Sequence, residues 1–225
     1  EVKTSVDKKY RHNAFGLALC RCIILSMESK RYLVIDLEAT CFDSTSRDRR
    51  YANDVPISRE DMEIIEIGAV WSTQEGEVIE KFQSFVRPIL NPKLNVFCQD
   101  LTTISQYDID QAETYAEVAP KLRDFSTLYR NAEFWGSWGK FDLSQIESES
   151  LRHQIDMPIT LPHVNLKRQF AKLNKIGKEV GTKRALSMAK IPLAGTHHRA
   201  LDDAINIASL LPWCIGIKNL KSSIS

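Results

Sequence analysis

Residues 31–40 place two carboxylates at the end of an apolar, β-branched run, which predicts a buried β-strand. Because side chains along a strand alternate between its two faces, Asp36 and Glu38 point the same way. Such neighbours repel each other and lose hydration, and a cation between them would offset both costs. A strand end that runs into solvent would tolerate them as well. Whether this pair belongs to a metal site or to a solvated strand end therefore depends on whether the chain supplies further carboxylates.

The composition is that of a soluble globular protein with one ordinary domain. The chain has 225 residues, of which 43% are hydrophobic and 26% are charged. Its net charge of +1 excludes a polycation that binds nucleic acid by overall charge alone. The charge is uneven, since residues 163–190 hold eight basic residues and one acid. That segment could follow a phosphate backbone, or it could be an ordinary solvated helix surface.

The cysteines and the N-terminal residues suggest a cytoplasmic protein without a membrane partner. No spacing of a disulfide framework or a zinc site joins Cys20, Cys22, Cys41, Cys98 and Cys214, so we expect reduced thiols. The apolar run at residues 14–20 is too short to span a membrane. We expect an N-terminal extension, one catalytic domain and a C-terminal tail, over residues 1–26, 27–213 and 214–225.

Hydrophobic periodicity predicts an α/β fold with a mixed β-sheet and helices on both faces. A β-hairpin is expected first, and alternating helices and strands follow it. The expected strands cover residues 62–71, 78–86 and 132–138, and the expected helices cover 114–129, 141–154, 166–173, 182–190 and 199–211. Glu66, between Ile65 and Ile67, is expected to point away from the core. The polar 42–61 loop is either a solvated insertion or a basic flap near the carboxylates.

Two more acids are candidates to join the first pair. Asp142 follows an expected strand at the start of a helix, where α/β proteins bind ligands, although a helix N-cap would also explain it. In the last helix, Asp203 aligns with the margin of the apolar face, whereas Asp202 aligns with polar positions. Asp203 is therefore the acid that needs a partner.

His198 is a candidate general base. It lies five residues before Asp203, about 140° around a continuous helix, so both reach one site only if His198 precedes the helix. Gly195 and Thr196 favour a loop there. A histidine beside carboxylates suits proton transfer near neutral pH because its ordinary pKa is about 6.5.

The order Asp-x-Glu, Asp and His-x4-Asp resembles the DEDDh 3′–5′ exonucleases of the ribonuclease-H-like superfamily. The resemblance runs from about residue 31 to residue 212 and is strongest to the Eri-type and KapD-like branch. The matching segments are residues 35–41, 63–69, 97–102, 137–142 and 196–208. A shared order over such a length is more specific than any one of these segments.

The resemblance implies a ribonuclease-H-like sheet and a two-metal reaction. By analogy, two Mg²⁺ or Mn²⁺ ions are held by Asp36, Glu38, Asp142 and Asp203, with Glu38 also counted as catalytic and His198 as the general base. Two such ions, about 4 Å apart, clamp an in-line displacement at phosphorus. The implied activity removes 5′-nucleotides from single-stranded 3′ ends of RNA or DNA, and the sequence does not choose between the polymers.

The resemblance also suggests substrate contacts. Leu37, Ala39, Thr40 and Lys140 are expected to border the terminal nucleotide, although ordinary packing would explain the first three. Trp135 and Trp138 could stack on bases, but we expect them in the core. Two alternatives stay open, a nucleic-acid-binding or KapD-like regulatory module with minor catalysis, and a polymerase proofreading subunit.

Overall fold

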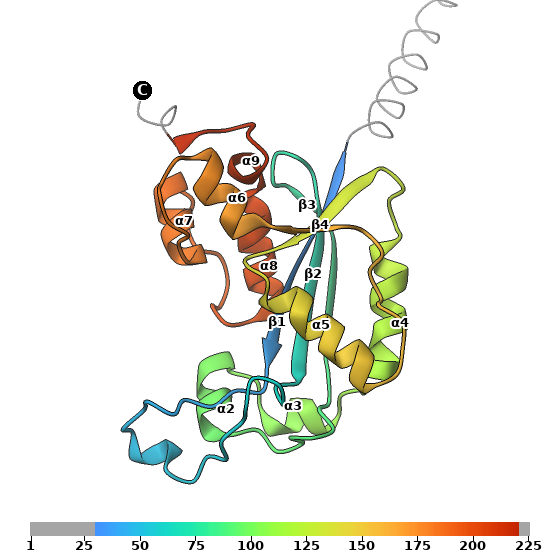
Figure 1. Ribbon diagram of the computed structural model, residues 1–225, viewed down its shortest axis with the longest axis vertical. Helices are drawn as coiled ribbons and strands as arrows, with labels where there is room; N and C mark the ends of the chain where they lie inside the picture. Colours follow the sequence, from blue (N-terminus) through green and yellow to red (C-terminus); the bar gives the residue numbers. More distant parts are fainter. Residues whose placement is uncertain (1–29, 221–225) are drawn as a thin grey trace, which may run out of the picture. The chain divides into compact units, whose positions relative to one another are not determined.

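The structure, a computed structural model, describes residues 30–220 (Figure 1). The expected N-terminal extension, with Cys20 and Cys22, lies outside the described residues, as does the end of the expected tail. Cys41, Cys98 and Cys214 are free thiols. Every helix within residues 30–220 is too short or too polar to cross a bilayer.

A five-stranded mixed sheet forms the centre of the described residues, in the order β3-β2-β1-β4-β5. Its strands are β1 (Arg31–Ala39), β2 (Ile64–Ser72), β3 (Val78–Phe85), β4 (Ala132–Ser137) and β5 (His163–Asn165). The hairpin of β2 and β3 is antiparallel, and β2 is also antiparallel to β1. By contrast, β4 lies parallel to both β1 and β5. This arrangement confirms the predicted mixed α/β sheet.

Helices cover both faces of this sheet, as predicted (Figure 1). One face is covered by α4 (Tyr115–Ser126) and α5 (Phe141–Arg152). The other is covered by α6 (Leu166–Leu173), α7 (Thr182–Ala189), α8 (Ala200–Ser209) and α9 (Leu211–Cys214). Beyond the end of β1 lie the 3₁₀ helix η1 (Arg49–Tyr51), α2 (Val96–Thr102) and α3 (Gln106–Asp110).

Two expected helices end earlier than the periodicity suggested. The helix expected over residues 114–129 ends at Ser126 as α4, and Leu128, beyond its end, is 55% exposed. The expected helix over residues 199–211 is interrupted at Leu210, after which α9 begins. Pro212 explains this break, because its nitrogen carries no hydrogen for the carbonyl four residues earlier.

Strand alternation divides β1 between two hydrophobic cores. Leu33, Ile35 and Leu37 belong to the core under α4 and α5, which also contains the buried Trp135. Tyr32 and Val34 belong to the opposite core, under α6 to α9, and Trp138 packs against that core. Both tryptophans therefore take part in the cores, as expected. Since Asp36 and Glu38 continue the row of Tyr32 and Val34, both acids lie on the face that α8 covers.

Gly68 allows the first turn of α8 to lie directly on the sheet. It pairs with Asp36 across β1 and β2, and it belongs to the same sheet face. A Cβ atom at Gly68 would lie 2.1 Å from the Ala200 carbonyl carbon and 2.2 Å from the Leu201 nitrogen. Any side chain here would meet backbone, which cannot rotate away. The position of the start of α8 therefore depends on this glycine.

The 42–61 loop is attached to α2 and is not an isolated flap. The carboxylate of Asp54 accepts hydrogen bonds from the Val96 and Phe97 amides, both at 2.9 Å. Arg50 in η1 forms an ion pair with Asp100 in α2. The loop contains four basic and five acidic residues. It is thus a packed segment without net positive charge, which argues against the basic-flap interpretation.

Gly68→Ala should lower the stability of the protein. The added methyl group must displace the first turn of α8, and overpacking of this kind costs about 1–3 kcal/mol. Gly181→Ser is the control, because nothing lies within 4 Å of a Cβ at Gly181 and serine is a good N-cap residue. Thermal unfolding measurements check both variants. Equal behaviour of the two would contradict the importance of the close approach at Gly68.

Candidate active site

The first three carboxylates of the site come from β1 and α8. Asp36, Glu38 and Asp203 each place one carboxylate oxygen so that all three atoms lie within 4.8 Å of one another. Asp36 is partly exposed, whereas Glu38 and Asp203 are only 9% and 5% exposed. Residues 167 positions apart in the chain therefore form one acidic cluster, which opens to solvent through Asp36.

Asp142 approaches this cluster from the other side of the sheet. It is the second residue of α5, since Lys140 occupies the N-cap position, so the N-cap interpretation is wrong. Its carboxylate oxygen accepts a hydrogen bond from the Leu37 amide, between Asp36 and Glu38, at 3.2 Å. The negative charge of Asp142 also raises the pKa of Asp36. Asp142 thus belongs to the same site, although it lies outside the 4.8 Å cluster.

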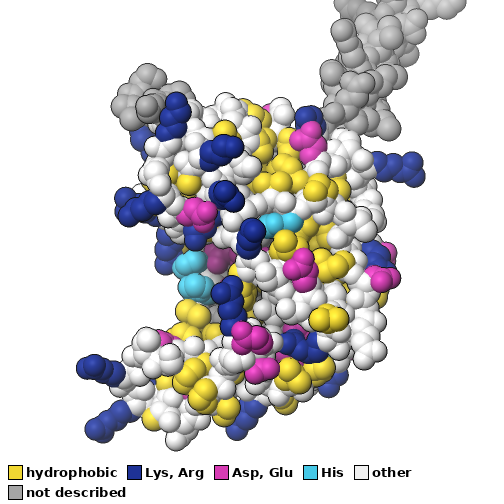
Figure 2. All heavy atoms as spheres, in the orientation of Figure 1, with side chains coloured by type: hydrophobic (Ala, Val, Ile, Leu, Met, Phe, Trp, Pro, Cys, Tyr) yellow, Lys and Arg dark blue, Asp and Glu magenta, His cyan; other side chains and the backbone are white. Residues whose placement is uncertain are grey.

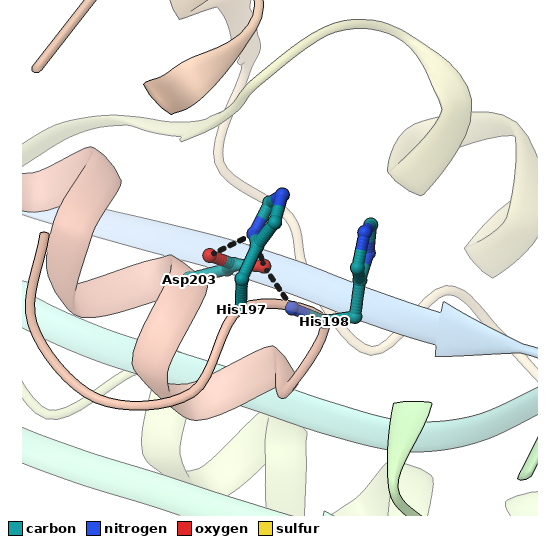
Figure 3. Close-up of side chains that lie close together, drawn as sticks. All are labelled: His197, His198 and Asp203. Atoms are coloured by element: carbon teal, nitrogen blue, oxygen red, sulfur yellow. Dashed lines mark hydrogen bonds and ion pairs between the residues drawn. The ribbon is translucent and has the colours of Figure 1, made fainter. Parts of the chain in front are cut away.

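The turn before α8 brings two histidines to Asp203 (Figure 3). His198 has a left-handed φ of 64° and precedes the helix, as expected. Its backbone amide donates to an Asp203 oxygen at 2.9 Å. His197 Nδ1 lies 3.0 and 3.1 Å from the two oxygens of the same carboxylate. The two imidazole rings stack with their centroids 4.0 Å apart.

His197 is a site residue that the sequence analysis missed. The His197–His198 doublet was visible in the sequence, but only His198 was singled out, as the histidine of the His-x4-Asp motif. The left-handed turn at His198 brings the preceding side chain back over Asp203. A turn of this kind follows no periodicity, so the side chain directions of such a doublet cannot be read from spacing.

The expectation that Glu66 points away from the core is wrong. Its side chain is fully buried, and it accepts hydrogen bonds from the Arg199 guanidinium at 3.0 and 3.1 Å. It also accepts one from the Ala200 amide at 3.0 Å. The expectation failed because helices and loops cover both faces of β2. Side chains that alternate along this strand therefore point to one buried face or the other, and none points to solvent. Glu66 holds the start of α8 on the sheet.

Asp202 has a supporting function in the turn. Its carboxylate accepts a hydrogen bond from the Thr196 amide at 2.7 Å and is only half-buried. Gly195, with φ of +67°, leaves the space that the Asp202 carboxylate fills. The carboxylate takes no part in the acidic cluster around Glu38. The structure therefore agrees with the prediction that Asp203, and not Asp202, is the acid that joins the other carboxylates.

Burial and mutual repulsion oppose ionisation of these carboxylates. Burial, followed by the charges of neighbouring acids, raises the pKa of Glu38 to about 8 and the pKa of Asp36 well above its usual range. Burial raises the pKa of Asp142 to about 6, against the opposing hydrogen bond from Ser137. Within residues 30–220, no Lys or Arg forms an ion pair with any of the three. Oxygen donors without an internal cation fit hard divalent ions such as Mg²⁺ and Mn²⁺.

The electrostatics around His198 favour its neutral form. Burial is the main reason that its pKa is lowered, and the charges of His197 and Lys183 lower it further. The carboxylate of Asp203 opposes this change. A neutral imidazole can accept a proton, which is what a general base requires.

The expected substrate contacts lie around the end of β1. Leu37 and Ala39 are buried, and the Thr40 hydroxyl accepts a hydrogen bond from the Glu63 amide at 2.9 Å. These three side chains are packed inside the protein, so only their few exposed atoms could contact a nucleotide. Lys140 is exposed. Their roles in substrate binding stay predictions.

Comparison with known proteins agrees with this geometry. The RNase T family model, described as an exonuclease, matches residues 33–211. The chain belongs to this family. The match includes all four acids and both histidines of the site. Membership of this 3′–5′ exonuclease family confirms the resemblance stated from the motifs.

Two relatives represent the branches named from the sequence. The 3′-5′ exoribonuclease 1 of Homo sapiens is 28% identical over 187 residues, which cover 79% of this chain and 50% of the relative. The probable 3′-5′ exonuclease KapD of Bacillus subtilis (strain 168) is 28% identical over 186 residues, which cover 82% and 84%. The chain thus spans about half the length of the first relative.

Solved structures support the fold. The nuclease domain of 3′hExo, a DEDDh family member, superimposes with a TM-score of 0.66 at 24% identity, over 80% of this chain and 88% of that one. The cell-death related nuclease CRN-4 gives a TM-score of 0.65 at 23% identity, over 84% and 65%. These likenesses confirm the predicted ribonuclease-H-like fold.

In the presence of a chelator, the free energy of unfolding should decrease as pH rises from about 4.5 to about 8. Over this range Glu38 keeps its proton in the folded state, where its pKa is about 8, and loses it when unfolded. The unfolded state then binds fewer protons, so stability falls, by at most about 1.4 kcal/mol per pH unit for one group. Glu38→Gln should flatten the profile, and the exposed Glu80→Gln should not. Denaturant titrations at several pH values measure this, and parallel profiles for all three proteins would contradict it.

Added Mg²⁺ or Mn²⁺ should raise the melting temperature. An ion at 100 times its dissociation constant adds about 2.7 kcal/mol, which corresponds to roughly 5–10 °C for a domain of this size. Asp203→Asn should reduce the shift, whereas Asp202→Asn should keep it, because only Asp203 belongs to the cluster. Differential scanning calorimetry with and without chelator measures the shift. Equal shifts in the two variants would exclude Asp203 as a ligand.

Proposed function

We propose that this protein is a metal-dependent exonuclease that removes 5′-nucleotides from single-stranded 3′ ends of RNA or DNA. The observation that carries the proposal is the convergence of four acids and a neutral histidine from β1, α5, and α8 with the turn before it. The three segments are far apart in the sequence, so packing alone gives no reason to bring so many acids together. Catalysis of phosphodiester hydrolysis does give a reason.

The carboxylates would hold the cations that such a reaction needs. Asp36, Glu38, Asp142 and Asp203 would bind two divalent ions, which supply the positive charge that stabilises the attacking and departing oxygens. The chain itself holds these ligands in place. The Leu37 amide holds Asp142, and the amide of His198 and the ring of His197 hold Asp203.

His198 would act as the general base. As a water oxygen attacks phosphorus, the neutral imidazole takes its proton, and the bond from phosphorus to the 3′ oxygen of the preceding nucleotide breaks. The released nucleotide keeps the phosphate at its 5′ position. The backbone of His198 is fixed on Asp203 and its ring is stacked on His197, so the base stays beside the carboxylates.

The position of the site and the relatives support the proposed substrate class. Leu37, Ala39 and Thr40 would border the terminal nucleotide, and the exposed Lys140 would contact a phosphate. The similar nuclease domain of 3′hExo was solved bound to rAMP, and exonuclease X was solved with 5′ overhanging duplex DNA. Relatives of this fold have therefore been solved with a ribonucleotide and with DNA, and we propose a 3′ end of either kind.

The test is a degradation assay with 5′-labelled single-stranded RNA and DNA in Mg²⁺ or Mn²⁺. We expect 3′-shortened ladders that disappear with chelator and with Asp203→Asn. Loss of a general base reduces rates by about 10²–10⁴-fold, so His198→Ala should leave little activity. Asp202→Asn is the matched control and should retain the ladder. Degradation of neither polymer by the wild type would refute the proposal, and equal loss in Asp202→Asn and Asp203→Asn would refute the assignment of Asp203.

A further inference from the structure

Helix α6 presents a row of cations beside the proposed active site. Leu166 and Phe170 bury its inner side, while Arg168 and Lys172 are exposed. Residues four apart lie on the same side of a helix, so these two side chains are neighbours. Lys175 and Lys178 continue the exposed row beyond the helix end. We call Arg168, Lys172, Lys175 and Lys178 the α6 track.

Two hollows border the α6 track, each of about 410 Å³. Arg168 and Lys172 line both of them, so they stand on the ridge between the hollows. The hollow on one side is completed by His163, Val164, Asn165 and Gln169. The other is completed by Ala171, Lys175, Gly177, Lys178 and Glu179. A ligand in either hollow can therefore reach the same two cations.

The first hollow begins next to Asp142. His163 Nε2 lies 3.0 Å from the hydroxyl of Ser137, the last residue of β4, and the turn after Ser137 leads directly to Asp142 in α5. Asn165, at the start of α6, is in register with Ser137 across the parallel strands β4 and β5. The charge of Lys140 also lowers the pKa of His163, after the larger effect of burial. A polynucleotide whose 3′ end lies at the carboxylates can thus pass directly into this hollow.

The charges of the α6 track are not neutralised by neighbouring acids. Within residues 30–220, none of its four cations forms an ion pair, and Glu179 is the only acid of residues 163–190. Figure 2 shows Lys and Arg side chains gathered over α6 and α7, above the histidines. By contrast, the 42–61 loop has more acids than bases, and Arg50 is paired with Asp48 and Asp100. An anionic polymer is therefore attracted to the α6 side of the site.

We propose that the α6 track binds the phosphates of the single-stranded substrate on the 5′ side of the scissile bond, so that the strand leaves the site over α6 and not over the 42–61 loop. The inference rests on the proposed function, since it assumes a polynucleotide whose 3′ end is at the carboxylates. Flexible cations beside open hollows suit binding without sequence preference, driven by counterion release. The eight residues of α6 extend about 12 Å, so the α6 track lies beyond the terminal nucleotide.

The first test measures binding without catalysis. In an Asp203→Asn background, a fluorescent single strand of about 16 nucleotides, the upper site size of small single-strand binders, is titrated at several salt concentrations. Arg168→Gln with Lys172→Gln removes two phosphate contacts, so the salt slope of log Kd should become shallower by about 1.4, which weakens binding about 25-fold at 0.1 M salt. The control pair Lys81→Gln with Arg130→Gln makes the same charge change near the opposite edge and end of the sheet. Equal slopes in the two pairs would overturn the proposal.

The second test uses substrate length and the competing path. Otherwise wild-type enzyme degrades a dinucleotide, which is too short to reach the α6 track, and the long strand. The Arg168→Gln and Lys172→Gln pair should lose at least tenfold more kcat/KM on the long strand than on the dinucleotide. A loss independent of length, or a larger loss with Arg47→Gln and Arg49→Gln in the loop, would overturn the proposed path. A wild type that binds the strand over α6 but cleaves neither substrate would refute the exonuclease activity and leave the binding inference supported.

Discussion

The active site depends on one contact, the placement of the first turn of α8 on β2. Gly68 allows the helix backbone to touch the strand, and Glu66, two residues earlier on the same face, receives the Arg199 side chain and the Ala200 amide. The raised pKa values of Asp36 and Glu38 show how strongly the cluster opposes its own ionisation. The ion pair joins the fully buried Glu66 to the partly buried Arg199, and breaking it would leave the Glu66 charge buried and unpaired, so it can hold the start of α8, and with it Asp203, beside the other acids.

The opposite core supplies the fourth acid. Asp142 begins α5, which packs beneath the sheet, yet its carboxylate reaches the Leu37 amide at the end of β1. This is possible because β1 and β4 are parallel, so their carboxyl ends meet at one edge of the sheet and the helix after β4 starts there. The site thus lies where the two cores meet, and a displacement of either core changes the distances between the acids.

Sequence reasoning succeeded where one periodicity governed a residue. Alternation in β1 placed Asp36 and Glu38 on one face, and helical spacing separated Asp203 from Asp202. It failed for Glu66, because both faces of this central strand are covered, and the alternation of side chains does not show whether a face is buried or exposed to solvent. It also missed His197, whose direction is set by a left-handed turn, and it could not decide how the 42–61 loop packs, because that depends on contacts with α2.

The distribution of charge would explain how an acidic site receives the polyanionic substrate proposed for it. Four carboxylates would repel a phosphate, and the proposed divalent cations would offset that repulsion only within a few ångströms, where their ligands partly neutralise them. Phosphates further from the 3′ end therefore need a separate source of attraction, and residues 163–190, with eight bases and one acid, are placed beside Asp142 through β5. Under this proposal, affinity for the polynucleotide and chemistry at its 3′ end would depend on different residues. The spacing of the acids would then have to suit only the metal ions. The exposed, flexible cations on α6 would bind the phosphates of a polynucleotide of any base sequence.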